Sequence, residues 1–427
     1  MKSDGSEVKQ ITGTVGFELN PVWSPDGTRI LYAGFQPKMG DPYAQYLQLL
    51  KLNFIDTTKT ELFIVDKDGQ NWQRLTNFNS SIWHPTWVDD KTVIFSSDYD
   101  ILTLKSLNDP QIQFLYSFNI ESKELVRLTE NNLFGFDSFP TYDYNTGILI
   151  WTSNRIQQEK STKLSYDIYM ASLNQPPRHP FFVDGLHHEH KQQNTVKYHL
   201  KKKSLIYEGE DHFESLKQLT FGGQNAEGYF TKDDTEMIFQ AMGRNIYGTD
   251  CDQIYRHQLI PIFPNEKTIP QRMSTGLGAC TCSYLFPDHQ TSLYAGSFRA
   301  VNFSSSLENG ACPSKKCKSK LAETDPVLKG LCNTSYVWDI IPDYDIFKVG
   351  KFGEFIKQLT DTEGYDAEAT ISPDGKLIVY TSMASGDLDL WLMDSNGDNK
   401  QQITTAIGYD GGAFFSPDGT KLIFLMI

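Results

Sequence analysis

The stretch Asp366-Ala-Glu-Ala-Thr-Ile-Ser-Pro-Asp-Gly-Lys-Leu-Ile-Val-Tyr380 decides the fold, because it recurs with few changes as Asp410-Gly-Gly-Ala-Phe-Phe-Ser-Pro-Asp-Gly-Thr-Lys-Leu-Ile-Phe424. The two Ser-Pro-Asp-Gly turns begin at Ser372 and Ser416, 44 residues apart. This period is typical of a four-stranded propeller blade, at about 40–45 residues. Pro presets φ, Asp bonds its own backbone and Gly accepts positive φ. We therefore expect the turn to join the first and second strands of each blade.

Further copies of this turn run along the chain, intact at 24–27 and weaker at 286–289, 231–234, 88–91 and 142–145. A second landmark closes most units, with Thr or Ser after an aliphatic residue: Gln10-Ile-Thr12, Arg74-Leu-Thr76, Arg127-Leu-Thr129, Gln218-Leu-Thr220, Met273-Ser-Thr275, Gln358-Leu-Thr360 and Gln402-Ile-Thr404. Two landmarks in alternation predict an all-β fold, a single β-propeller of four-stranded antiparallel blades. Asp66–Gly69 and Asp394–Asp398 are expected to be turns between third and fourth strands, since no bidentate Glu follows as in a calcium loop.

Leu377-Ile-Val-Tyr380 after the turn, followed by Leu390-Trp-Leu-Met-Asp394 and Gln402-Ile-Thr404, resembles the TolB-like β-propeller repeat family, a WD40-like repeat. The resemblance covers nearly the whole chain outside its insertions. It implies a propeller that binds a protein or peptide partner, although fold analogy alone is a weak basis for function.

The repeat count favours seven blades over six. Six full units run from Ser24 to Thr404, while 413–427 supplies a first and a second strand and Val8–Thr12 resembles a fourth strand. We expect these N- and C-terminal strands to share a seventh blade and close the ring. The alternative is a six-bladed ring in a fragment cut within a repeat. We predict one propeller domain over 1–427, with insertions at about 36–59, 173–215 and 298–338.

Charge and composition exclude some classes of function. The net charge of −14 argues against nucleic acid, which needs a basic face. No apolar run is long enough for a membrane span, and Met1–Glu7 has no apolar core typical of a secretory signal. Six cysteines, five of them within or flanking the 280–332 region, favour at least one disulfide and an extracytoplasmic compartment. Free thiols in a cytosolic protein are the alternative.

The channel mouth is the predicted ligand site, because the starts of the first strands converge there. The candidate ligand-binding residues are His84, Asp137, Glu227, Tyr365, Asp366, Glu368, Tyr409 and Asp410. Carboxylates beside Tyr rings attract a cation, a basic peptide or a metal. Alternatively, these carboxylates cap backbone N–H groups and brace neighbouring blades.

These residues favour a non-catalytic scaffold that binds a protein or peptide partner, possibly a basic one, with no cofactor, metal or catalytic residue. One alternative is a metal-assisted enzyme acting on a saccharide, similar to the oligogalacturonate lyases, with ligands from His84, the carboxylates or His187-His188-Glu189-His190. Another is the accessory propeller of a peptidase. No G-x-S-x-G elbow is present, so such a peptidase domain would lie outside this chain.

Overall fold

A computed structural model describes the chain in segments. These are residues 1–13, 16–37, 40, 43–44, 46, 59–99, 112–130, 135–143, 146–155, 165–173, 205–231, 233–259, 270–302, 311–315, 317, 319–324, 326, 329, 332 and 340–426. Much of each predicted insertion, including the His187–His190 cluster, lies outside them. None of the helices in these segments is long and apolar enough to cross a membrane.

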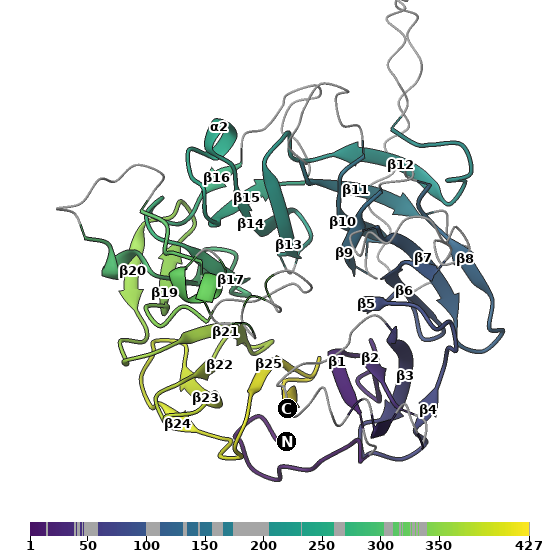
Figure 1. Ribbon diagram of the computed structural model, residues 1–427, viewed down its shortest axis with the longest axis horizontal. Coiled ribbons are helices and arrows are strands. Elements are labelled where there is room, and N and C mark those ends of the chain that lie inside the picture. Colours follow the sequence, from purple (N-terminus) through teal and green to yellow (C-terminus); the bar gives the residue numbers. More distant parts are fainter. Residues whose placement is uncertain are drawn as a thin grey trace, which may run out of the picture.

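Six four-stranded antiparallel sheets surround a central opening (Figure 1). In chain order they are β1 (Phe17–Trp23), β2 (Arg29–Phe35), β3 (Glu61–Asp66) and β4 (Gln73–Arg74); β5 (Ile82–Trp87), β6 (Thr92–Ser97), β7 (Phe114–Asn119) and β8 (Leu125–Arg127); β9 (Asp137–Asp143), β10 (Ile148–Ser153), β11 (Asp167–Leu173) and β12 (Phe213–Gln218); β13 (Gln224–Phe230), β14 (Glu236–Met242), β15 (Gln253–Gln258) and β16 (Gln271–Arg272); β17 (Cys280–Leu285), β18 (Thr291–Gly296), β19 (Asp345–Gly350) and β20 (Phe355–Gln358); and β21 (Asp366–Ile371), β22 (Leu377–Ser382), β23 (Asp389–Asp394) and β24 (Gln401–Gln402). Short helices α2 (Arg244–Tyr247), η3 (Phe298–Ala300) and α3 (Lys320–Thr324) lie in the connections. The four-stranded blade that the repeat predicted is confirmed.

The Ser-Pro-Asp-Gly turn joins the first two strands of a blade, as predicted. The Ser372 hydroxyl donates to Asp374 Oδ1 at 2.7 Å and accepts from the Leu377 amide at 2.9 Å. Gly375 has φ 74°, where a side chain would be strained. The turn that starts at Ser416 repeats the same bonds, so one local chemistry recurs around the ring.

The second landmark fixes the outermost strand to the third strand. The hydroxyl of its Thr or Ser accepts a backbone N–H of the third strand in all six blades, at 2.7–3.0 Å. In the first blade, Thr76 also donates to the Glu61 carboxylate at 2.6 Å. The aliphatic residue before it, such as Leu359, is buried against the neighbouring blade. The recurrence of the landmark therefore has a structural cause.

The prediction of a seventh blade is wrong, because the structure has six blades. Among the described residues, the seventh position holds a two-stranded hairpin, β25 (Asp410–Phe415) and β26 (Leu422–Met426). Val8–Thr12 is not a strand, because the described residues provide no third strand with which it could pair. One antiparallel bridge, Lys2 to Lys421, joins the N-terminal segment to the hairpin.

The ring is consequently not closed by a hydrogen-bonded sheet that the two ends of the chain share. Side-chain packing closes it instead. Ile423 and Phe414 of the hairpin contact Ile30, Tyr32 and other core residues of the first blade. On the other side, Leu422 packs with Val379 of the sixth blade. Figure 1 shows β25 between β21 and β1, next to both chain ends.

Candidate functional site: a ring of channel residues

Each innermost strand carries a β-bulge at the same place. The pairing with the second strand shifts within β1, β5, β9, β13, β17, β21 and β25, and the shift encloses a residue with positive φ in every one. These residues are Asn20 (φ 50°), His84 (49°), Phe139 (54°), Glu227 (54°), Cys282 (50°), Glu368 (57°) and Gly412 (60°). We call them the channel ring. Bulges often re-aim a side chain near a functional site, and here all seven residues are half-buried.

One arc of the channel ring is polar and aromatic. The His84 ring lies 4.1 Å from the Phe139 ring, centroid to centroid, and the His84 amide donates to Asn20 Oδ1 at 3.4 Å. His84 Nδ1 lies 3.4 Å from the Ser138 hydroxyl. Burial lowers the pKa of His84 to about 4, so the imidazole is neutral at pH 7. Predicted site residue His84 therefore lies on the innermost strand of its blade as an uncharged group.

The opposite arc is acidic, and Glu368 is its most heavily bonded member. Its Oε2 accepts from Tyr409 Oη at 2.6 Å, from the Gly412 amide at 2.9 Å and from Thr381 Oγ1 at 3.1 Å. Its Oε1 accepts from Tyr365 Oη at 3.1 Å. The structure thus brings three predicted site residues, Tyr365, Glu368 and Tyr409, into one network.

Glu227 is the other carboxylate of this arc. No hydrogen bond or ion pair reaches it from the residues that the structure describes. Burial raises the pKa of Glu227 to about 7, with smaller contributions from Asp252 and Glu368. Burial likewise raises the pKa of Asp252 to about 6, against the lowering effect of Lys315. Burial therefore disfavours the ionised forms of Glu227 and Asp252.

Cys282 lies between these two glutamates in the channel ring. Burial raises the pKa of its thiol well above the usual range, and Glu227 and Glu368 raise it further. The Cys282 side chain is thus a protonated thiol at pH 7 and extends the arc without adding charge.

Three predicted carboxylates lie two residues before a bulge and are buried within their blades. Asp366 accepts from Thr362 Oγ1 at 2.5 Å, and Asp410 is fully buried. Asp137 accepts from Trp151 Nε1 at 3.0 Å. The structure does not bring these three into the channel ring, and the contacts of Asp366 and Asp137 are those of braces.

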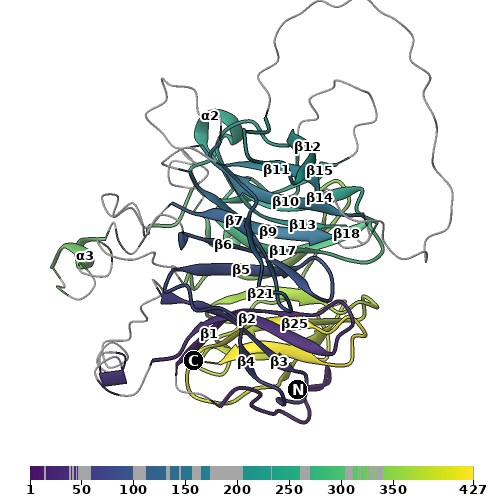
Figure 2. The ribbon, with the colours of Figure 1, turned by 90° about the vertical axis from the view of Figure 1, so that its right-hand side faces the viewer.

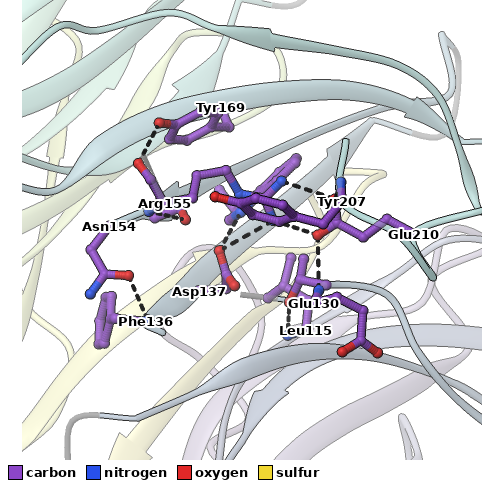
Figure 3. Close-up of polar contacts among 12 residues, drawn as sticks. Leu115, Glu130, Phe136, Asp137, Asn154, Arg155, Tyr169, Tyr207 and Glu210 are labelled. Carbon is purple, nitrogen blue, oxygen red and sulfur yellow. Dashed lines mark hydrogen bonds and ion pairs between the residues drawn. The ribbon is translucent and has the colours of Figure 1, made fainter. Parts of the chain in front are cut away.

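Figure 3 shows the brace around Asp137. Buried Arg155 lies 2.8 Å from Glu210 Oε1 and 3.7 Å from Asp137 Oδ1. Tyr207 and Tyr169 flank the guanidinium at 5.3 and 5.5 Å from their ring centroids. Glu210 also accepts the Glu130 amide at 2.9 Å, which ties the second blade to the third.

One face of the ring, here called the mouth face, holds the starts of the first strands. The connections from second to third strands lie on the same face, because neighbouring strands are antiparallel. Figure 2 shows α3, from one of these connections, projecting from one face of the ring. The predicted disulfide is confirmed twice, by Cys251–Cys312 and Cys317–Cys332. The first of these attaches residues 311–315 to the start of the third strand β15, beside Asp252.

Exposed apolar side chains also lie on the mouth face. Phe221 is 44% exposed and Ile407 is 99% exposed, each in a connection between consecutive sheets of the ring. Ile246 of α2 is 54% exposed and lies over Gly222, next to Phe221. An acidic arc below apolar side chains suits a ligand that carries both a positive charge and apolar groups.

Sequence reasoning missed Cys282, Asp252 and the channel ring itself. The signal that could have revealed the ring is positional: its members stand two residues after Asp137, Asn225, Cys280, Asp366 and Asp410. Of the eight predicted residues, His84, Glu227 and Glu368 belong to the ring, and Tyr365 and Tyr409 bond to it.

Comparisons with solved structures return β-propellers. One match is an oligogalacturonate lyase in complex with manganese, at 11% identity, 97% of this chain, 88% of that chain and a TM-score of 0.54. Another is a puromycin-hydrolyzing peptidase from Mycobacterium tuberculosis, at 10% identity and a TM-score of 0.52, over 92% of this chain but 48% of that one. TolB from Acinetobacter baumannii also matches, at 13% identity, 92% of this chain, 80% of that chain and a TM-score of 0.42.

Identities this low show the shared propeller fold and nothing more specific. No protein-family model matches the chain, and no curated protein sequence does. The residues of the site must therefore carry the argument for function.

Proposed function

We propose that this protein is a non-catalytic propeller that binds a basic segment of a protein or peptide partner at the mouth face. A cationic side chain of the partner would enter the acidic arc of the channel ring, between Glu227 and Glu368. Apolar residues of the partner would contact Phe221, Ile246 and Ile407 around it.

The carboxylate of Glu227 carries this proposal. Its pKa is raised to about 7, and among the described residues it has no bonded partner. A Lys or Arg placed beside it would favour the ionised form and gain a charge-assisted hydrogen bond. The net charge of −14 would also speed the approach of a basic partner.

The metal-dependent alternative stays a prediction. The described residues contain no group of three or more His, Cys, Asp or Glu side chains that could hold a metal ion, and the His187–His190 cluster lies outside them. His84, a candidate metal ligand in that alternative, contacts Phe139 and Ser138. No observation on the described residues favours the accessory-peptidase alternative either.

Fluorescence anisotropy tests the proposal with a labelled Leu-Arg-Leu-Arg-Leu peptide, against Leu-Gln-Leu-Gln-Leu as the neutral probe. We expect the basic probe to bind and the neutral probe to bind at least tenfold more weakly. Glu227→Gln should weaken the basic probe by about tenfold, which is about 1.4 kcal/mol. The matched control is Glu214→Gln, an exposed carboxylate on β12.

The double variant Glu227→Ala plus Glu368→Ala separates binding from bracing. We expect it to fold and to lose the basic probe. If it fails to fold, these carboxylates are structural braces. Equal binding of the two probes by the unmodified protein would contradict the proposal directly.

A further inference from the structure

Residues 311–315, here called the strap, lie on the mouth face beside the acidic arc. They belong to the connection between the second and third strands of the fifth blade. The Cys251–Cys312 disulfide attaches them to the start of β15, with the two Cα atoms 5.7 Å apart. Cys312 also packs against a buried cluster that contains Tyr365, whose hydroxyl donates to Glu368. The strap is therefore fixed next to the carboxylates of the arc.

Lys315 is the charged residue of the strap, and it is exposed. It follows Cys312 by three residues, which span at most about 11 Å. Asp252 directly follows the other cysteine of the disulfide. Burial raises the pKa of Asp252, and the Lys315 ammonium lowers it. Among the groups that shift the pKa values of Asp252 and Glu227, Lys315 is the one that carries a positive charge. The strap therefore supplies the arc with a cation from the chain itself.

The backbone of the strap is held in an unusual conformation. Ala311, directly before Cys312, has φ 53°, which residues with a Cβ atom rarely adopt. Pro313, directly after Cys312, has its own φ fixed by its ring. A strained residue persists only where its surroundings fix it, and the disulfide is the covalent bond that does so here. Opening the disulfide would let Ala311 relax and Lys315 move away from Asp252.

We propose that the strap is autoinhibitory and under redox control: the Cys251–Cys312 disulfide holds Lys315 at the acidic arc, where its ammonium opposes the cation of a basic partner. Reduction of the disulfide releases the strap and strengthens binding. This inference rests on the binding function proposed above and adds the regulation of that site.

The reductant is a dithiol. Its thiolate attacks Cys312 Sγ, because Cys312 is half-buried whereas Cys251 is 8% exposed. The S–S bond breaks, and Cys251 leaves as a thiolate that takes up a proton. The second thiol of the reductant then displaces Cys312, which also ends as a thiol. Two electrons pass to the protein, and the dithiol becomes a cyclic disulfide.

Fluorescence anisotropy with the labelled Leu-Arg-Leu-Arg-Leu peptide and the full chain tests the role of Lys315. We expect Lys315→Gln to bind the peptide about threefold more tightly than the unmodified, oxidised protein, a gain of the size that an exposed ion pair supplies. The matched control is Lys320→Gln on α3, which removes the same charge from another exposed lysine of the same connection. It should leave the affinity unchanged.

A second set of variants tests the disulfide. Cys251→Ser plus Cys312→Ser should tighten binding by about the same factor, and adding Lys315→Gln should give no further gain, because both changes remove one effect. Cys317→Ser plus Cys332→Ser opens the other disulfide and should leave the affinity unchanged. Dithiothreitol should produce the same gain in the unmodified protein once mass spectrometry shows Cys251 and Cys312 reduced.

Three results would overturn the inference. One is equal affinity of Lys315→Gln and the unmodified protein. Another is an equal gain from Lys315→Gln and Lys320→Gln, since net charge alone would then explain it. The third is a full additional gain when the disulfide is opened in Lys315→Gln. Because Lys315 is exposed, the first two do not depend on whether the cysteine variants fold. If no variant binds the basic peptide, the proposed binding function is contradicted, and this regulation with it.

Discussion

The sharpest consequence of the channel ring is a pH-dependent stability that Glu227 controls. Burial raises the pKa of Glu227 from 4.5 to about 7 in the folded protein. Between those two pH values the folded state holds a proton that the unfolded state has lost. The free energy of unfolding therefore falls as pH rises through this window and levels off above about pH 7. Each pKa unit is 1.36 kcal/mol, so the full loss is at most roughly 3 kcal/mol.

Glu227→Gln removes this loss because the amide is neutral and nearly isosteric. We expect the variant to match the unmodified protein near pH 4.5 and to exceed it by up to roughly 3 kcal/mol at pH 8. Urea unfolding at half-unit steps from pH 4.5 to 8.5 measures the difference, with exposed Glu214→Gln as the control that should follow the unmodified protein. A variant less stable at pH 8 would refute the reasoning, since the carboxylate would then have a stabilising partner.

Three further predictions concern other parts of the propeller. Thr404→Val removes the hydroxyl that accepts the Leu390 amide at 2.8 Å. We expect urea titration to show a free energy of unfolding lower by about 1–3 kcal/mol. The control is Thr405→Val, the same change at an exposed neighbour, which should leave the free energy of unfolding unchanged. Arg155→Met leaves Glu210 buried without its partner and should cost about 3–5 kcal/mol in the same assay; an unchanged midpoint would contradict the brace. The pKa of the Cys282 thiol is well above its usual range, so Cys282 should resist iodoacetamide at pH 8 in the folded protein and react after unfolding. Mass spectrometry measures the labelling. Rapid labelling of Cys282 without urea would disprove the protonated thiol.

The repeat predicted the blades because its turn chemistry is local. Ser372, Asp374 and Gly375 bond within a few residues, so sequence alone fixed their conformation. The predicted number of blades was wrong for the opposite reason. Val8–Thr12 has the residues of a fourth strand, but a strand forms only beside a partner, and counting landmarks does not count partners.

The sequence could predict only those site residues whose place is decided by their position along the first strand of a blade. The positions of Glu227, Glu368 and His84 near the start of their strands could be predicted. The bulge at which each of them lies could not, because non-Gly residues rarely adopt positive φ and residue propensities give little sign of it. Asp137 occupies a similar place in sequence and lies instead against Arg155. That contact depends on Glu210, 55 residues beyond Arg155, and no local pattern reveals it.

The most direct test of a cation site in the channel is the pH dependence of binding. The affinity of the labelled Leu-Arg-Leu-Arg-Leu peptide should rise between pH 6 and 8, as Glu227 ionises near pH 7, and this rise should be lost in Glu227→Gln. An affinity that stays flat or falls over this range in the unmodified protein would contradict the account.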